Sequence, residues 1–427
     1  MKNKKGNIII VVGGNYGSES KGLVTGHLAV DRKVKYAVRT GSINAGHSVP
    51  YKGKMYKNQQ IPVAWVNPRT KLVIGAGAYV SPEILSAEIK MIEKATGTSL
   101  KNRLFIDHRC GAHLPSHHNA EKGMHERMGS TGEGCSEAIK DKMSRSFDYV
   151  MFKDTTYAKR NDGRHFRIVD TVTMLNDAYD RGNTILLEGT QGTMLDLHLS
   201  HYPYCTSRQT IASSWLAEAG LSPSLNTEVV MVCRTFPIRV AGNSGPLPEE
   251  LEWSTLAREI NNKLVSAEME PLVGAGSLDT FDNLQALLQK NWDMPVKPFD
   301  KYTSKERVTY SDKLVKIHKA ILENIKPSVL ADLKNFFETT TVTKKLRRIG
   351  RLNLDELRYA VKINRPSYIA LNFLNYAFPH LYSVNKDTPY NKIPKVRQIN
   401  AYLKHIEEYV GCKIKFVNWS PWTITKR

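Results

Sequence analysis

The sequence predicts an α/β fold, a single large domain with a mostly parallel central sheet covered by helices, plus a helical insertion. Two patterns predict it: short runs of β-branched and other apolar residues recur along the chain, and helical patterns separate several of them. The length agrees, because 427 residues with 41% hydrophobic content can bury a large core.

Six apolar runs predict buried parallel strands. Each is short and rich in Val, Ile or Leu, and most of them run into glycine, as strands that lead into ligand loops do. They are residues 7–12, 36–41, 71–77, 184–189, 229–236 and 367–374. Helical spacing at residues 82–95 and 354–364 supplies the intervening helices.

Residues 251–338 have a different hydrophobic pattern, with helical spacing and little sign of strands. We therefore expect an α/β domain made of residues 1–250 and 339–427, interrupted by a helical insertion at 251–338. The sequence has no internal repeat and no low-complexity linker, which argues against separate modules.

Lys and Arg number 61 against 41 Asp and Glu, which gives a net charge of +20 and favours anionic partners. Nucleic acid, an anionic membrane and phosphorylated metabolites all qualify. The five cysteines form no CxxC pair, which indicates a reducing compartment rather than a disulfide framework or a zinc site. No stretch is long enough to span a bilayer. We expect a cytoplasmic protein without a membrane partner, in the host cytoplasm if a phage encodes it.

Two loops that follow predicted strands carry candidate chemistry. GGNYGSESKG, residues 13–22, matches neither the Walker A pattern nor GxGxxG, yet it offers backbone N–H groups and Lys21 to a phosphate. RTGSINAGHSV, residues 39–49, places His47 where open α/β sheets bind ligands.

Four further stretches line up with these two loops: residues 129–145, 186–210, 239–250 and 339–357. In this order the six motifs resemble the adenylosuccinate synthetase family, over nearly the whole chain apart from the insertion. The resemblance implies a carbon–nitrogen ligase that joins a 6-oxopurine nucleotide to L-aspartate. In that reaction a nucleoside triphosphate phosphorylates the purine O6, and the aspartate nitrogen then displaces the phosphate.

The first loop departs from the family pattern GDEGKGK. Ser18 stands where the family has the aspartate that removes the purine N1 proton and helps to hold magnesium. A serine hydroxyl is not a plausible general base at its free pKa. Glu19 is interpreted as a surface or helix N-terminal charge rather than as the replacement. A magnesium-bound water, His47 or the incoming aspartate stay open as the base.

The same departure favours a different nucleotide. A carboxylate facing purine N1 would crowd a 2-amino group, whereas the smaller serine can accept a hydrogen bond from it. Guanine nucleotides carry this amine, and the chain looks most like the phage aminodeoxyadenylosuccinate synthetase branch, which makes the precursor of 2-aminoadenine DNA from dGMP. We therefore rank dGMP above IMP, although the sequence does not separate ribose from deoxyribose.

The triphosphate site departs as well. Asn375 stands where the family presents an aspartate to the guanine of GTP. A side-chain amide offers one donor and one acceptor, which is the pairing that adenine requires. ATP or dATP is the expected phosphoryl donor, while weak binding of guanine through the Asn375 oxygen stays open.

The resemblance implies roles for the other matching positions. The catalytic residues are Ser18, Lys21, His47 and Gln191. The nucleoside monophosphate contacts are Ser18, Asn44, Ser130, Thr131, Arg145, Gln191, Thr206 and Lys345. The aspartate contacts are Val342, Thr343 and Arg347. The ATP contacts are Gly17, Ser20, Lys21, Gly22, Gly46, His47, Ser48, Asn375, Ser420 and Pro421. The Mg²⁺ ligands are Ser18 and the Gly46 carbonyl.

Two of these roles need comment. Arg145 matches an arginine that the family supplies across a dimer interface, which implies a homodimer with a shared site. Lys345 replaces a family arginine and lacks its two-point grip on a carboxylate, so Arg347 is our choice for aspartate and Lys345 for the sugar.

Two other functions stay open. One is an ordinary adenylosuccinate synthetase acting on IMP with GTP, which Ser18 and Asn375 both oppose. The other is a catalytically inactive relative that binds nucleic acid, which would show salt-sensitive DNA binding. The spread of the basic residues and the retained His47, Lys21 and Arg347 argue against nucleic acid as a partner.

Overall fold

The computed structural model of this chain describes residues 5–121, 132–240, 243–272, 338 and 347–427. The chain forms two compact units. One unit comprises Met1–Glu250, Thr341–Lys344 and Arg348–Arg427, and the other comprises Leu251–Thr340 and Lys345–Arg347. The described helix of the second unit is α9 (Trp253–Val265), which buries Trp253 and Leu256. Most of the predicted insertion lies outside the described residues.

A ten-stranded sheet forms the centre of the first unit, in the order β17-β16-β15-β11-β1-β10-β2-β5-β7-β9. Every neighbouring pair is parallel except β16 with β17. The strands are β1 (Asn7–Gly13), β2 (Tyr36–Arg39), β5 (Lys71–Ile74), β7 (Leu104–Asp107), β9 (Arg167–Val169), β10 (Thr184–Glu188), β11 (Thr227–Arg234), β15 (Tyr368–Asn372), β16 (Ile414–Ser420) and β17 (Thr423–Lys426).

The predicted fold class is confirmed. All six predicted strands lie in this sheet, and the predicted helices are α2 (Pro82–Thr96) and α13 (Leu354–Asn364). Four strands of this sheet were not predicted: β7, β9, β16 and β17. β7 and β9 have only four and three residues, and no glycine follows them within two residues, whereas the equally short β2 and β5 run into Gly41 and Gly75.

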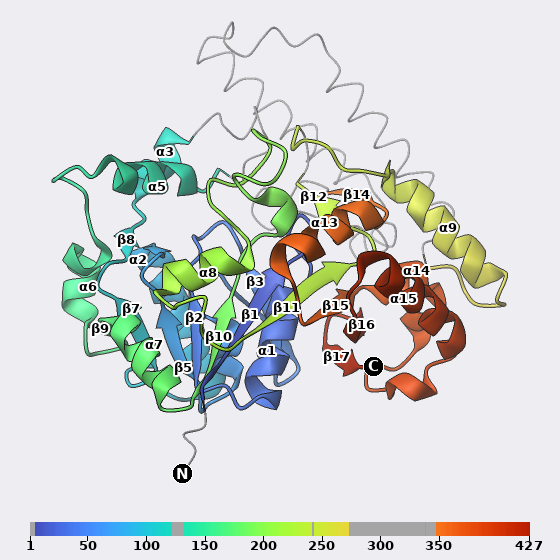
Figure 1. Cartoon of the computed structure of the whole chain (residues 1–427), viewed down its shortest axis with the longest axis horizontal. Coiled ribbons are helices and arrows are strands. Elements are labelled where there is room, and N and C mark those ends of the chain that lie inside the picture. Colours follow the sequence, from blue (N-terminus) through green and yellow to red (C-terminus); the bar gives the residue numbers. More distant parts are fainter. Residues whose placement is uncertain (1–4, 122–131, 241–242, 273–337, 339–346) are drawn as a thin grey trace, which may run out of the picture. The chain divides into compact units, whose positions relative to one another are not determined.

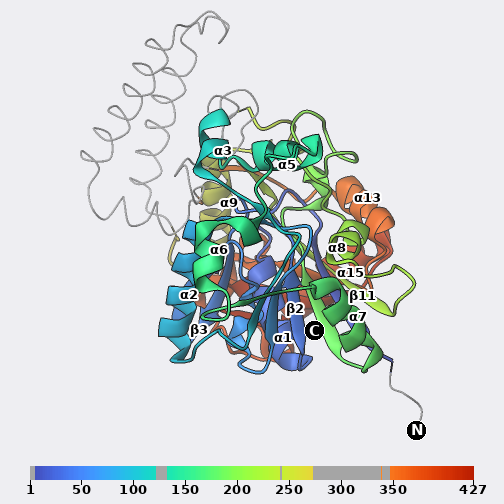
Figure 2. The ribbon, with the colours of Figure 1, turned by 90° about the vertical axis from the view of Figure 1, so that its left-hand side faces the viewer.

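Helices cover both faces of the sheet (Figures 1 and 2). Ile9 and Val11 of β1 pack in one cluster with α1 (Lys21–Asp31) and α2. Their neighbours in β1, Ile8 and Ile10, face a second cluster with α7 (Thr171–Asp180) and α8 (Ala212–Ala219). Because successive side chains of a strand point to opposite faces, a strand that is apolar throughout must be buried on both.

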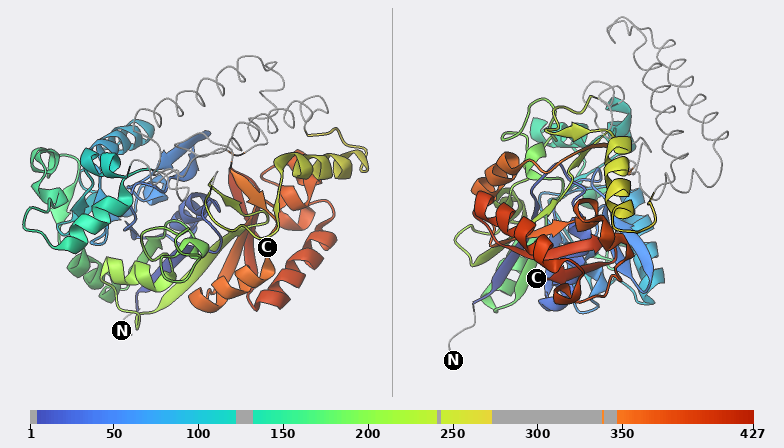
Figure 3. Two further views of the ribbon diagram at one scale, coloured as in Figure 1. Left: turned by 90° about the horizontal axis from the view of Figure 1, so that it is seen from above. Right: turned by 90° about the vertical axis from the view of Figure 1, so that its right-hand side faces the viewer.

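A third cluster packs α13 and α15 (Val396–Val410) against β15 and β16. These helices lie beside their strands in the orange and red part of Figure 3.

Smaller elements complete the two units. They are β3 (His47–Tyr51), β4 (Lys54–Asn58), β6 (Tyr79–Val80), β8 (Gly111–Ala112), β12 (Ile238–Arg239), β13 (Glu250–Leu251), β14 (Arg348–Gly350), α3 (Pro115–Ala120), α5 (Cys135–Ser144), α6 (Thr156–Asn161), α14 (Leu374–Ala377), η1 (Val63–Val66), η2 (Phe152–Asp154), η3 (Thr193–Leu195), η5 (Pro379–Ser383) and η6 (Tyr390–Lys392).

The parallel strands bring their carboxyl ends to one edge of the sheet, where open α/β sheets bind ligands. Five adjacent strands, β15-β11-β1-β10-β2, lead there into the loops that the sequence analysis selected. Among the described residues, no helix has both the length and the apolar character that crossing a membrane requires.

Candidate active site

Glu19 organises the first loop. Its carboxylate accepts hydrogen bonds from the backbone N–H of Asn15 at 3.2 Å and of Gly17 at 2.7 Å, and from Lys21 Nζ at 2.5 Å. Glu19 is fully buried and Lys21 is almost so. Of the two interpretations offered for Glu19, a surface charge is wrong, whereas the residue does directly precede Ser20, the N-cap of α1. Because its oxygens already bind these three donors, it shapes the loop and orients Lys21.

Ser18 contrasts with its neighbours because it is exposed. Its φ of 57° places it in the left-handed region, which turns the chain sharply between Gly17 and Glu19. Its carbonyl accepts a hydrogen bond from Arg234 Nη1 at 3.1 Å, so the main chain is fixed while the residue stays accessible. The predicted contact residue thus presents itself to solvent at the edge of the sheet.

Glycine is required where this loop meets its neighbours. A Cβ atom at Gly13 would lie 2.5 Å from the Gln191 carbonyl oxygen, and one at Gly22 would lie 2.4 Å from the Ser48 carbonyl oxygen. Such distances are too short for a carbon atom. These close contacts bring the first loop against the predicted residues Gln191 and Ser48.

His47 is held by a buried carboxylate that the sequence analysis missed. His47 Nδ1 lies 2.6 Å from Glu188 Oε1, and the same oxygen accepts a hydrogen bond from Arg39 Nη1 at 2.6 Å. The other oxygen of Glu188 accepts one from the Val63 N–H at 2.8 Å. Arg39 also donates to the Ala45 carbonyl, which fixes the loop before His47.

Burial, and then the Arg39 guanidinium, lower the pKa of His47 to about 4. Burial alone would raise the pKa of Glu188, but Arg39 and the His47 hydrogen bond outweigh it and lower that pKa. At pH 7 the imidazole is therefore neutral, with its proton on Nδ1 facing Glu188. His47 Nε2 is left as a hydrogen-bond acceptor of fixed direction.

Gln191 and Asn44, both predicted to contact the monophosphate, meet in the structure. Gln191 Nε2 donates to Asn44 Oδ1 at 2.9 Å, and the Thr190 hydroxyl donates to Gln191 Oε1. Gln191 has a φ of 53°, an uncommon conformation for a residue with a side chain. Thr206, further along the same segment, is half-buried, and its N–H donates to the Leu195 carbonyl at 2.8 Å.

The predicted base contacts lie on two adjoining elements. Asn375 is buried in α14, directly after β15, and Ser420 and Pro421 follow at the end of β16. Asn418 joins the two, because its Oδ1 accepts a hydrogen bond from the Phe373 N–H at 2.7 Å. That bond fixes the orientation of the amide, and Asn418 Nδ2 is then a buried donor with no partner among the described residues.

The remaining predicted contacts divide into three groups. Arg145 is exposed at the end of α5 with a φ of 55°. Arg347 lies in the second unit, where its carbonyl accepts a hydrogen bond from Trp253 Nε1 at 2.6 Å. The others lie outside the described residues: Ser130, Thr131, Val342, Thr343 and Lys345.

The predicted magnesium ligands are the Ser18 hydroxyl and the Gly46 carbonyl. Both residues are exposed, and both supply the hard oxygen donors that Mg²⁺ prefers. Neither donor is charged. This set fits an ion that is held mainly by nucleotide phosphates and water.

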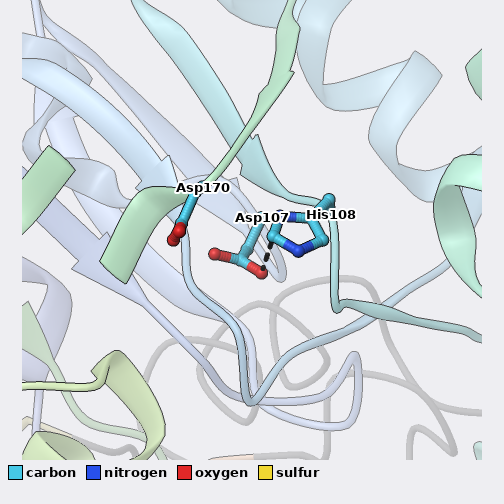
Figure 4. Close-up of side chains that lie close together, drawn as sticks. All are labelled: Asp107, His108 and Asp170. Atoms are coloured by element: carbon cyan, nitrogen blue, oxygen red, sulfur yellow. Dashed lines mark ion pairs between the residues drawn. The ribbon is translucent and has the colours of Figure 1, made fainter. Parts of the chain in front are cut away.

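A separate cluster of Asp107, His108 and Asp170 resembles a metal site (Figure 4). Asp107 is already saturated, since its two oxygens accept five hydrogen bonds of 2.7–2.9 Å from Arg109 and Thr171. Burial alone would raise the pKa of Asp107, but these bonds lower it to about 2. Asp170 caps α7 and also accepts from Arg109. The cluster is an ion-pair network with no lone pair left on Asp107 for a metal.

The missed residues share one signal in the sequence. Arg39, Glu188, Arg234 and Asn372 each end a buried strand, and each is at most 1% exposed. Polar side chains in that position need partners, which the loops of a ligand site supply.

Comparisons with known proteins identify relatives of this chain. The family model described as adenylosuccinate synthetase matches residues 10–159 and 147–377. The adenylosuccinate synthetase of Pyrococcus horikoshii is 28% identical over 417 residues, which are 97% of this chain and 96% of that protein. The enzyme of Methanocaldococcus jannaschii is 29% identical over 416 residues, 96% of this chain and 94% of that protein.

Two solved structures share the fold. The succinoaminodeoxyadenylate synthetase (PurZ) of cyanophage S-2L, bound to dGMP and to dATP as an energy donor, superposes with a TM-score of 0.68 and 21% identity. That match covers 99% of this chain and 95% of that one. Fully ligated adenylosuccinate synthetase from Plasmodium falciparum gives a TM-score of 0.66 and 18% identity, with 99% and 100% covered.

Proposed function

This chain belongs to the adenylosuccinate synthetase family of carbon–nitrogen ligases, and we propose that it condenses dGMP with L-aspartate at the expense of ATP or dATP. The product is N6-succino-2-amino-2'-deoxyadenylate, a precursor of 2-aminoadenine DNA. The observation that carries the proposal is Ser18, an exposed neutral residue where the family has an aspartate.

The chemistry follows the family reaction in two steps. A base takes the purine N1 proton, for which His47 Nε2 and the incoming aspartate amine both stand open; O6 then attacks the γ-phosphorus and ADP (or dADP) leaves. The aspartate nitrogen attacks C6 and gives up a proton, and inorganic phosphate leaves with O6. Lys21 stabilises charge on phosphate oxygens, as fixed cationic groups do in phosphoryl transfer. His47 Nε2, an acceptor in the neutral ring, hydrogen-bonds a phosphate oxygen once it has taken up a proton, which the negative charge of a bound nucleotide favours. Magnesium, when bound, neutralises further charge on those oxygens.

The choice of dGMP depends on the 2-amino group. A hydroxyl at residue 18 accepts a hydrogen bond from this amine, whereas an aspartate at that position would crowd it. Glu19 does not take over the lost aspartate, because Asn15, Gly17 and Lys21 already occupy its carboxylate. The cyanophage protein of similar fold was solved with the same monophosphate, dGMP.

The choice of an adenine triphosphate depends on Asn375 and on the adjoining β16 end. The Asn375 amide offers a donor and an acceptor, and Asn418 Nδ2 is a buried donor beside the same turn. Adenine needs such mixed partners, whereas guanine N1–H and N2–H suit a carboxylate.

We further propose a homodimer that shares Arg145 between subunits. Arg145 is flanked by apolar side chains that are exposed in the single chain, Met143 at 73% and Phe147 at 107%. Large apolar side chains clustered on a surface are typical of protein interfaces.

Ordinary adenylosuccinate synthesis from IMP and GTP is the second candidate, since the sequence relatives named above are enzymes of that name. The test is a matrix of turnover assays with L-aspartate and Mg²⁺. ATP or GTP is combined with dGMP, GMP or IMP, and the succinylated nucleotide is measured by chromatography. We expect product from dGMP with ATP; turnover of IMP with GTP but not of dGMP would select the second candidate.

Ser18→Asp sharpens this assay. It should lower kcat/KM for dGMP by about 10-fold or more relative to IMP, because the carboxylate crowds the amine. An unchanged ratio would show that residue 18 does not read the 2-amino group.

A further inference from the structure

Lys57 lies against the loop that the proposed function assigns to phosphate. A Cβ atom at Gly46 would lie 1.9 Å from Lys57 Cε and 2.8 Å from Lys57 Nζ. The lysine side chain therefore crosses directly over Gly46, which is exposed and directly precedes His47 in the chain. No motif in the sequence analysis included Lys57.

The hairpin of β3 and β4 fixes this position. Ser48 pairs with Lys57 and His47 pairs with Asn58 across the two strands. Asn58 is fully buried, and its Oδ1 accepts a hydrogen bond from Trp65 Nε1 at 2.8 Å. Lys57 therefore directly precedes a residue that is held rigidly. Its half-buried side chain has a fixed direction before any ligand binds.

The charge of Lys57 also acts on Glu133, in the segment before α5. Glu133 lies two residues after the predicted monophosphate contact Thr131, and it is only 9% exposed. Burial raises the pKa of Glu133, and His118 and Lys57 oppose that rise. The ammonium group consequently lies between the Gly46 loop and the segment that follows the predicted monophosphate contacts.

We propose that Lys57 binds phosphate oxygens of a substrate nucleotide at the Gly46 loop. This inference depends on the proposed function for the identity of the nucleotides. Lysine is a compact charge on a flexible stem, and it suits phosphate binding without a planar grip. Its effect adds to that of Lys21, which approaches from the first loop. The phosphate belongs to the triphosphate or to the monophosphate, and separate titrations distinguish them.

The experiment is isothermal titration calorimetry of the full chain with MgATP and, separately, with dGMP. Lys57→Met is compared with Lys54→Met, because Lys54 is exposed on the same strand and points to the opposite face. We expect Lys57→Met to weaken the binding of one of the two nucleotides by about 10-fold or more. Lys54→Met should change neither affinity by more than about 2-fold. Lys57→Arg should retain most of the affinity, since it keeps the charge.

Glu133→Gln separates phosphate binding from a merely structural pair. If Lys57 binds phosphate, removing the neighbouring negative charge leaves nucleotide affinity unchanged or increases it. If Lys57 only pairs with Glu133, both substitutions lower affinity alike, and the inference is overturned. Unchanged affinity for both nucleotides in Lys57→Met would overturn it as well. Binding is measured without turnover, so failure to convert dGMP would refute the proposed function and leave this test intact.

Discussion

Two groups of buried polar side chains lie at the carboxyl ends of the strands, and they differ in how completely their hydrogen-bonding atoms are paired. At β7, next to the edge strand β9, every lone pair of Asp107 is occupied by Arg109 and Thr171. At the central strands β15 and β2, Asn372 Oδ1 and Arg39 Nε are buried atoms with no partner among the described residues, as is Asn418 Nδ2 on β16 beside them.

This difference separates a cluster that stabilises the fold from one that is ready to bind a ligand. A saturated ion-pair network gains nothing from a ligand, whereas buried atoms without partners cost free energy until something binds them. The centre of the sheet, and not the cluster that looks like a metal site, is therefore where we place the ligands.

The largest expected effect tests the central group. His47→Asn keeps a donor for Glu188 but removes the Nε2 acceptor, so kcat should fall by about 10²- to 10⁴-fold. The thermal midpoint should stay close to that of the parent chain. A kcat within 2-fold of the parent, with the same substrates, would remove His47 from the reaction.

The edge group should behave in the opposite way. Asp107→Asn loses the charge that Arg109 and Thr171 stabilise, so the free energy of unfolding in urea should fall by about 2 kcal/mol while kcat at 25 °C is unchanged. Asp170→Asn is the control, because asparagine also caps a helix and should cost only about 0.5 kcal/mol. Stabilisation of the parent by Mg²⁺ or Zn²⁺, absent in Asp107→Asn, would instead make the cluster a metal site.

Asn375→Asp tests the central group further, because it changes a side chain that is proposed to bind the base of the triphosphate. A carboxylate accepts from both guanine donors, so the ratio of kcat/KM for GTP to that for ATP should rise by about 10-fold. Steady-state kinetics with saturating aspartate and monophosphate measure this ratio. An unchanged ratio would mean that Asn375 does not contact the base.

The last prediction concerns the pH dependence of stability. His47 and His113 each have a pKa of about 4 in the folded chain, lowered first by burial from an ordinary value of 6.5. Since the unfolded chain binds these protons first, stability is full above pH 6.5 and declines as the pH falls toward 4, by at most about 1.4 kcal/mol per pH unit for each histidine. Urea unfolding across this range should show the slope, and His47→Asn should reduce it. A flat profile would contradict the buried neutral state of both rings.

Much of the fold could be predicted from the sequence, because buried parallel strands are apolar throughout and end at glycines. The site was predictable only in part. The resemblance selected Asn44, Gln191 and Asn375. In the structure Asn44 and Gln191 meet, and α14, which carries Asn375, contacts β16, while their ligand roles stay predictions. The pairing of His47 with Glu188 spans 141 residues and leaves no local pattern. The burial of Glu19 depends on the closed shape of the loop, which its sequence alone does not reveal.

The central claim is that a neutral hydroxyl at residue 18 receives the exocyclic amine of a guanine nucleotide. A crystal structure of the chain with dGMP bound tests it most directly, through the distance between the 2-amino nitrogen and Ser18 Oγ. We predict a hydrogen bond of about 3 Å. An amine that points to another part of the site, out of reach of Ser18, would contradict the assignment.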